Sequence, residues 1–335
     1  MRMLFQALRQ KMRERTAAVL VTVIASSGSV PRGAGAHMLV TRQGRISGTI
    51  GGGAVEYRCE QLAQQVLASG GSRVEYFPLR PGEVQDLGMI CGGNVQVEFR
   101  YLPAGDTGIQ ALCEQAETLY RRGEPSWLIA GLSAGGGLSV YGKNSGLFGA
   151  AVPPEVLQTL SNKPRRVHAD GQEFYCEKFI QGGRVYLFGG GHVAQSLVPA
   201  LAAVDFRCVV LEDRAEFCRA ELFRGVEETR LIDTDDPAAY RDITGEDYIC
   251  VMTRGHKDDL TVQKHALKTP AQYIGVIGSR RKAAGVFAQL REMGYSETEL
   301  ARITTPIGLD IRAETPAEIA VSITAQLIRQ RAETL

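Results

Sequence analysis

The clearest chemical signal in the sequence is a glycine-rich turn between an apolar run and a helical segment. Residues 184–188 (RVYLF) are followed by Gly189–Ala194 (GGGHVA), which fits the pattern G-x-G-x-x-A. In this pattern glycines permit the tight turn and let the backbone approach a phosphate, and the helix start offers free N–H groups. An acid that ends the next strand binds ribose. We therefore predict a nucleotide site at Gly189, Gly191, His192 and Asp213. A turn kept only for packing is the alternative.

Two basic loops follow later apolar runs in the same half of the chain. Residues 253–256 (TRGH) come after the run 248–252, and residues 278–280 (GSR) come after the run 273–277. The carboxyl ends of parallel strands share one rim of a sheet, and basic loops on that rim suit an anionic ligand carrying phosphate. We predict that Arg254, His256, Ser279 and Arg280 contact such a ligand. Ordinary solvated charge is the alternative.

A second glycine cluster lies in the first half of the chain. Gly51, Gly52 and Gly53 precede a helical segment, and consecutive glycines cost conformational entropy that packing alone does not explain. Their amides could hold an anion at the helix start. Arg32 belongs to a loop that a hairpin would bring near the glycines. Glu56, in the first helical turn, either joins the ligand site or complements the helix dipole.

One cysteine stands apart from the other six. Cys91 lies in residues 88–93 (GMICGG), where the flanking glycines leave its thiol sterically accessible. An accessible thiolate is a nucleophile and a soft ligand, so we predict Cys91 as a reactive thiol with Gly92 and Gly93 lining the same site. A structural cysteine is the alternative. The other six lie in apparent helices or strands and are predicted to be core residues.

The elements that must position these residues differ between the two halves. In the second half, nearly continuous apolar runs alternate with helical segments, which is typical of parallel strands covered on both faces: 184–188, 207–211, 248–252 and 273–277. In the first half, β-branched and alternating runs surround one helix: 17–25, 36–41, 45–50 and 95–99. We predict an α/β protein, with mixed or antiparallel strands in an N-terminal domain and a Rossmann-like doubly wound sheet in a C-terminal domain. Composition places the boundary between residues 1–165 and 166–335.

Composition excludes several classes of protein. The chain has 335 residues and a net charge of +1, which gives no reason to expect nucleic acid or a membrane as partner. Its N-terminus lacks the apolar run of a signal peptide, so we expect a cytoplasmic protein. Seven cysteines without a Cys-x-x-Cys pair argue against a disulfide framework and a structural zinc site. The sequence identifies no metal ligands.

Taken in order, these segments resemble the XdhC/CoxI family of xanthine dehydrogenase accessory proteins. The matching segments span nearly the whole chain: 27–32, 48–56, 88–93, 189–194, 253–256, 273–282, 306–310 and 313–316. Each is weak alone, but the ordered set is specific. The chain departs from the family at Ala54-Val55, where Cys or Cys-Leu is frequent, and at Arg312, where a small residue is common. The first departure removes a second thiol from any two-cysteine scheme.

The resemblance implies that the protein binds molybdenum cofactor, a phosphorylated pterin whose dithiolene holds the metal. It implies an accessory protein rather than an enzyme with its own turnover. Such a factor holds the cofactor while a cysteine desulfurase exchanges an oxo ligand for sulfido, and then delivers it to a xanthine dehydrogenase-type molybdenum hydroxylase. Glycine amides and arginines would hold the phosphate, and Cys91 would contact molybdenum or sulfur. Both glycine-rich halves stay open as the place where the pterin binds.

Two other functions fit the same residues. The first is an NAD(P)-dependent oxidoreductase that uses the C-terminal domain, which bound nicotinamide in the purified protein would favour. The second is a scaffold that binds a client enzyme with both glycine-rich sites empty. A homodimer is expected only because symmetric dimers are the commonest soluble oligomers.

Overall fold

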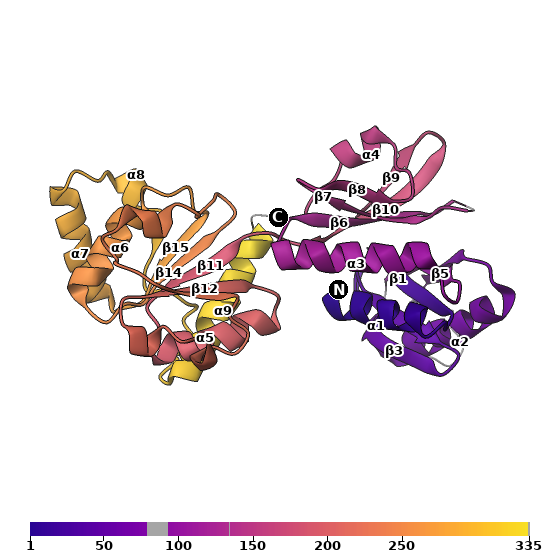
Figure 1. Cartoon of the computed structure of the whole chain (residues 1–335), viewed down its shortest axis with the longest axis horizontal. Coiled ribbons are helices and arrows are strands. Elements are labelled where there is room, and N and C mark those ends of the chain that lie inside the picture. The colour runs from indigo at the N-terminus through magenta and orange to yellow at the C-terminus, as the bar shows by residue number, and fades with distance from the viewer. Residues whose placement is uncertain (79–92, 134, 334–335) are drawn as a thin grey trace. The chain divides into compact units, whose positions relative to one another are not determined.

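The computed structural model describes residues 1–78, 93–133 and 135–333. The chain forms two compact units, Met1–Gln181 and Gly182–Leu335 (Figure 1). The first unit extends past residue 165 because β9 (Arg165–Ala169) and β10 (Gln172–Ile180) join its second sheet. None of the helices in the described ranges combines the length and apolar character that crossing a bilayer requires.

The first sheet of the N-terminal unit is antiparallel, with the order β3-β2-β1-β5-β4. Its strands are β1 (Ala18–Ser27), β2 (His37–Thr41), β3 (Gly44–Thr49), β4 (Arg73–Pro78) and β5 (Asn94–Leu102). Helix α2 (Gly53–Ser69) covers one face, where Val21, Val97 and Phe99 pack against Cys59 and Val66. The alternation of the strands thus buries one set of side chains under α2 and turns the other set toward the second sheet.

The second sheet of this unit is also antiparallel, with the order β8-β7-β6-β10-β9. Besides β9 and β10 it contains β6 (Ser126–Gly131), β7 (Leu138–Gly142) and β8 (Gly146–Gly149), and its helical neighbours are α1 (Arg2–Arg13), α3 (Thr107–Arg122) and α4 (Pro154–Gln158). Leu20 of β1, Tyr175 of β10, Leu8 of α1 and Leu119 of α3 share one buried core. The two sheets and helices α1 and α3 therefore form one packed body.

The C-terminal unit is a six-stranded parallel sheet with the order β13-β12-β11-β14-β15-β16. Its strands are β11 (Arg184–Phe188), β12 (Arg207–Glu212), β13 (Glu228–Leu231), β14 (Tyr248–Val251), β15 (Tyr273–Val276) and β16 (Ile303–Thr304). The order reverses between β11 and β14, and such a switch point is where open α/β sheets bind ligands.

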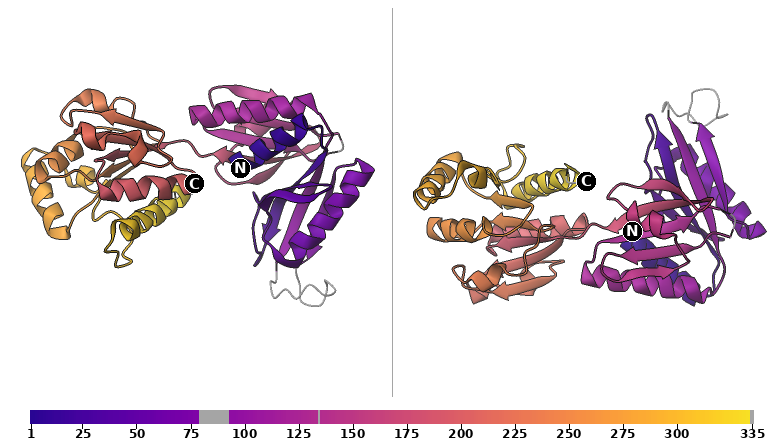
Figure 2. Two further views of the ribbon diagram at one scale, coloured as in Figure 1. Left: turned by 60° about the horizontal axis from the view of Figure 1, so that its bottom comes forward. Right: turned by 90° about the horizontal axis from the view of Figure 1, so that it is seen from above.

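Helices cover both faces of this sheet (Figures 1 and 2). The core under α5 and α9 includes Leu201 and Leu327, whereas the core under α6 and α7 includes Val262 and Leu290. The helices are α5 (His192–Ala203), α6 (His256–Ala266), α7 (Arg280–Glu292), α8 (Glu297–Leu300) and α9 (Pro316–Glu333), with short 3-10 turns at Ala215–Phe217, Ala220–Leu222 and Pro237–Tyr240. The predicted fold class is confirmed: antiparallel sheets in the N-terminal unit and a Rossmann-like sheet in the C-terminal unit.

Candidate functional site

Three separate segments of the N-terminal unit converge at the end of its first sheet. The loop after β1 lies against the glycine turn that precedes α2, because a Cβ added at Gly51 would lie 2.7 Å from the Cβ of Pro31. The same loop contacts Gly93, where an added Cβ would lie 2.5 Å from the carbonyl oxygens of Ser27 and Ser29. The approach of the Arg32 loop to the glycine turn was expected from the sequence, whereas the contact with Gly93 was not, and glycine is favoured at both contacts because a Cβ would clash.

The buried carboxylate of Glu56 stabilises the glycine turn. Its side chain is 9% exposed, and its carboxylate accepts hydrogen bonds from the amides of Ile50, at 3.0 Å, and Gly52, at 3.2 Å. It also accepts from the Thr49 hydroxyl and pairs with Arg45 Nη1 at 2.7 Å. Burial alone would raise the pKa of Glu56, but these hydrogen bonds and the Arg45 charge hold it below its ordinary value. The carboxylate is thus committed to shaping the turn.

The other side of the turn is open. Gly52 and Gly53 have φ angles of 76° and 64°, and nothing lies within 4 Å of a Cβ added at either position. Within the described ranges, the N–H groups of Gly53 and Ala54 at the start of α2 have no hydrogen-bond partner. Arg32 is exposed, and no ion pair of its side chain occurs among these residues. The backbone N–H of Arg32 lies 3.3 Å from a Cβ added at Gly51, so this exposed arginine belongs to the loop against the turn, and free amides with a nearby arginine suit phosphate or another anion.

The predicted reactive thiol falls outside the described part of the chain. Cys91 and Gly92 lie in the range 79–92, and Gly93 is the first described residue after it. The prediction for the other cysteines is largely confirmed: five are buried (Cys59, Cys113, Cys176, Cys208 and Cys250) and Cys218 is half-buried. Burial raises the pKa of Cys59, Cys113, Cys176 and Cys208 to about 12 and raises that of Cys218. These thiols are therefore poor nucleophiles.

In the C-terminal unit, the predicted glycine turn lies at the switch point of the sheet. Gly189 has a φ angle of 116°, and an added Cβ would lie 2.3 Å from the carbonyl oxygen of Met252. The loops after β11 and β14 are thus in contact. Nothing lies within 4 Å of a Cβ added at Gly191, and His192, the first residue of α5, is exposed. The turn keeps an open approach of the kind that a nucleotide phosphate needs.

Two acids lie where β12 ends, and the structure gives them different surroundings. Glu212, the last residue of β12, is buried, and its Oε2 accepts a hydrogen bond from the Gly190 amide at 2.6 Å. It also pairs with Arg214 at 2.8 Å. Burial would raise the pKa of Glu212, but these contacts lower it to about 2. Asp213 is half-exposed, and contact with the Glu212 carboxylate raises its pKa. Glu212 therefore holds the turn, and only Asp213 is free to face a ligand.

The two basic loops also divide into exposed and structural residues. Arg254 and Arg280 are exposed, whereas Ser279 caps α7 by accepting from the Lys282 amide at 3.3 Å. His256 begins α6, and its side chain lies outside what the structure describes. Sequence inspection missed the buried Asp259, which accepts from the Thr253 hydroxyl at 2.5 Å and pairs with Lys282. The sequence feature that could have identified Asp259 is its place as an acidic residue in the first turn of α6.

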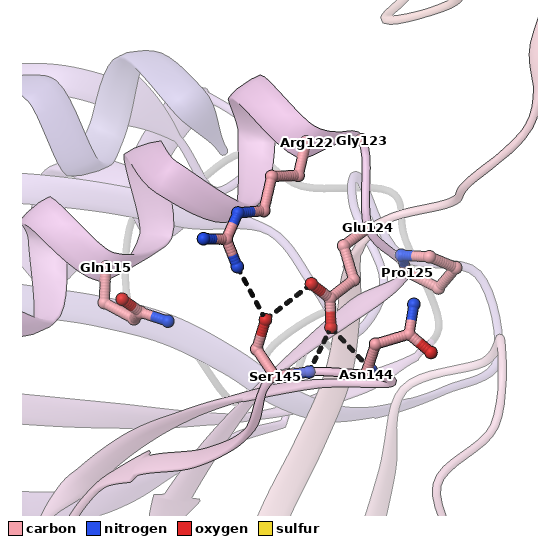
Figure 3. A pocket seen from close by; sticks show the side chains of 7 residues that line it. All are labelled: Gln115, Arg122, Gly123, Glu124, Pro125, Asn144 and Ser145. Carbon is pink, nitrogen blue, oxygen red and sulfur yellow. Dashed lines mark hydrogen bonds between the residues drawn. The ribbon is translucent and has the colours of Figure 1, made fainter.

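A polar pocket of about 660 Å³ lies at the end of α3, and none of the predicted site residues lines it (Figure 3). Its floor is the carboxylate of Glu124, which accepts from the amides of Asn144 and Ser145 at 2.6 Å each. Burial would raise the pKa of Glu124, but these hydrogen bonds lower it. Because its acceptors are occupied, this carboxylate anchors the β7–β8 turn. Within the described ranges no cluster of His, Cys, Asp and Glu could hold a metal ion.

The fold defines a two-unit α/β protein with an open glycine turn in each unit, and comparison with known proteins identifies its family. Residues 12–78 match the model described as "XdhC and CoxI family", and residues 185–327 match the model described as "XdhC Rossmann domain". Together these ranges make up more than half of the chain. The chain belongs to the XdhC/CoxI family.

Relatives and a solved structure agree with this assignment. The chain is 25% identical to a Bacillus subtilis protein named as a probable xanthine dehydrogenase subunit, over 94% of this chain and 93% of that protein. It is 22% identical to the molybdenum cofactor insertion chaperone PaoD of Escherichia coli, over 94% and 83%. It is 25% identical to the uncharacterized protein YqeB of Escherichia coli, but spans only 43% of that protein's length. A crystal structure described as a xanthine dehydrogenase from Bacillus halodurans shares the fold, with a TM-score of 0.78 at 23% identity over 99% of this chain and 96% of that one.

Proposed function

We propose that this protein is a molybdenum cofactor-binding maturation factor. It holds the cofactor as cargo for sulfuration and inserts it into a xanthine dehydrogenase-type molybdenum hydroxylase. The observation that carries the proposal is the convergence of three family segments, around Arg32, Gly51 and Gly93, on one open anion site. The names of the Bacillus subtilis relative and of PaoD support the same role.

The residues of the N-terminal site fit the phosphate of a pterin cargo. The free amides of Gly53 and Ala54 would donate to phosphate oxygens, and the Arg32 guanidinium would supply a charge-assisted hydrogen bond. The absence of side chains at Gly52 and Gly53 leaves room for a bulky ring system to approach the backbone. Pterin binding on this unit is therefore our assignment.

The same site is poorly equipped for turnover. Its buried carboxylate, Glu56, is occupied by hydrogen bonds that lower its pKa, so it is not poised as a general base. The arrangement is instead suited to binding and protecting the cofactor. In this scheme a cysteine desulfurase supplies the sulfur that replaces an oxo ligand of the cargo, and Cys91 contacts the molybdenum or the incoming sulfur.

The test is to purify the protein from a molybdenum-replete host and measure oxidised-pterin fluorescence together with molybdenum content. We expect near-stoichiometric pterin, with a loss of about tenfold in affinity for Arg32→Ala, the size of one charge-assisted hydrogen bond. Arg42→Ala is the matched control, because Arg42 is also exposed but lies at the other end of β2. Absence of pterin from a host with intact cofactor supply would refute the carrier function.

A nucleotide-dependent activity of the C-terminal unit is the second candidate. It is favoured by the contact between the Gly189 turn and Met252 at the switch point, beside the open position of Gly191. The exposed Asp213 and Arg254 border the same edge of the sheet. Titration with NADH and NADPH would test it, and an NAD(P)-dependent oxidoreductase requires that one of them bind and turn over.

A further inference from the structure

Ionisable side chains are buried between the two sheets of the N-terminal unit. His37 begins β2 in the first sheet and Glu177 lies on β10 in the second, with side chains only 7% and 4% exposed. His37 Nε2 lies 2.5 Å from Glu177 Oε1. Burying such groups is unfavourable unless they are paired, and an apolar pair would pack at lower cost. Their pairing across two sheets therefore calls for a role beyond packing.

Both partners are fixed by a second contact. His37 Nδ1 lies 3.0 Å from the Thr22 hydroxyl, and the Tyr175 hydroxyl donates to Glu177 Oε2 at 2.8 Å. These contacts place the imidazole between the Thr22 hydroxyl on β1 and the Glu177 carboxylate on β10. The carboxylate is thus held by the second sheet and in turn orients the imidazole.

The other buried charges in this layer have partners of their own. Arg100 on β5 pairs with Glu98 and donates to the carbonyl oxygen of Gly131 at 2.6 Å. Burial raises the pKa of Glu98, and the charges of Arg100 and His37 oppose that shift. Arg100 therefore links the sheets at a separate point, and Glu177 is the carboxylate that contacts His37.

His37 stands at the base of both loops of the anion site. The loop that carries Arg32 ends just before it, and its strand partner in the register is Thr49, which precedes the glycine turn. The Thr49 hydroxyl donates to Glu56, the carboxylate that shapes this turn. On the other side, a Cβ added at Gly35, the end of the Arg32 loop, would lie 3.3 Å from Glu177 Oε2.

We propose that Glu177 is a positioning residue for the anion site. Through His37 and its contact with Gly35, the second sheet clamps the Arg32 loop and the glycine turn in the geometry that presents their free donors to a ligand. The effect on pterin affinity rests on the proposed function, whereas the effect on the loops does not. The second sheet carries none of the residues predicted to bind ligand, and in this proposal its role is to position the residues of the first sheet that do.

The experiment compares Glu177→Ala and Glu177→Gln with the full-length parent by hydrogen exchange and by pterin binding. In Glu177→Ala, which removes the ion pair with His37 and the acceptor of the Tyr175 hydroxyl, amides of residues 28–36 and 49–56 should exchange about tenfold faster. Pterin affinity should fall about 10- to 100-fold, as when a residue that orients a ligand-binding group is removed. Glu177→Gln should restore much of both, because its amide oxygen keeps a polar contact with the imidazole and loses only the charge.

Glu173→Ala is the matched control, because Glu173 lies on the same strand and pairs with Arg166 near the surface. It should leave exchange in both loops unchanged. Should Glu177→Ala fail to fold, Tyr175→Phe removes only the hydroxyl that fixes the carboxylate and should speed exchange in the same two segments.

Unchanged exchange in the loops, or faster exchange spread evenly over β6 and β10, would overturn the clamp. Equal loss in the Gln and Ala variants would overturn it as well, because the polar contact with the imidazole would then not be what matters. If the parent protein binds no pterin, the proposed function fails while the exchange experiment still decides the clamp.

Discussion

Removing the carboxylate of Glu56 is the most direct test of how the N-terminal anion site is built. Glu56→Ala leaves the amides of Ile50 and Gly52 without their acceptor. Each hydrogen bond to a charged group contributes about 1.5–3 kcal/mol, and water can reach this turn to replace part of that. We expect the free energy of unfolding to fall by about 3 kcal/mol. Glu56→Gln keeps an acceptor oxygen and loses only the charge, so we expect a loss of about 1 kcal/mol.

The sequence offers a convenient assay for this prediction. The chain has a single tryptophan, Trp127 on β6, whose indole donates to the Ser161 carbonyl at 2.7 Å. Its fluorescence therefore reports on the N-terminal unit alone, which matters because a two-unit chain need not unfold in one step. Urea titrations followed at this tryptophan give the free energy of unfolding for each variant. Glu60→Gln is the control, because the half-buried Glu60 of α2 also pairs with Arg45, at 3.3 Å, and the variant therefore separates the loss of that ion pair from the loss of the hydrogen bonds to the turn.

The pH dependence has a definite sign. The folded-state pKa of Glu56 lies below its ordinary value of 4.5, so the carboxylate stabilises the fold above that pH. The contribution is lost as pH falls through the folded-state pKa, where a protonated Glu56 resembles glutamine. The gap between the parent and Glu56→Gln should therefore be full at neutral pH and close in acid. A gap that is below about 0.5 kcal/mol, or that does not change with pH, would refute this account of the turn.

Three further predictions follow from the same geometry. Glu212→Ala should destabilise the C-terminal unit by about 3 kcal/mol, seen in circular dichroism without a shift of the tryptophan transition. Because the pKa of Glu212 is about 2, the difference in stability between the parent and Glu212→Ala should persist in mild acid and disappear only as pH falls toward that value. If the native protein has a thiol that reacts rapidly with a thiol reagent, this reactivity should disappear in Cys91→Ala. Rapid reaction that persists in the variant would point to the half-buried Cys218. Gly93→Ala should cost about 1–3 kcal/mol by tryptophan-detected urea titration, whereas Gly71→Ala, with nothing within 4 Å, should cost little.

Much of the fold follows from local patterns in the sequence. The apolar runs of the C-terminal unit predict a parallel sheet because such strands are buried on both faces and have no polar side to alternate. The glycine turn at Gly189 is predictable because a positive φ and a close backbone contact leave no room for a Cβ. The approach of Pro31 to Gly51 follows from hairpin geometry. Each of these features is encoded within a few neighbouring residues.

The roles of the acidic residues were decided only by tertiary structure. From the sequence, Glu56 and Asp213 were both candidates for ligand contact. In the structure the Glu56 carboxylate accepts hydrogen bonds from the amides of its own turn, whereas Glu212 makes that kind of contact in the other unit and leaves Asp213 exposed beside it. The second sheet of the N-terminal unit was hardly readable from the sequence, because its antiparallel strands pair β6 with β10 across some 45 residues. The contact of His37 with Glu177 depends on that pairing. Burial and charge compensation arise when distant strands pack, and no local pattern records which carboxylate will find its partner there.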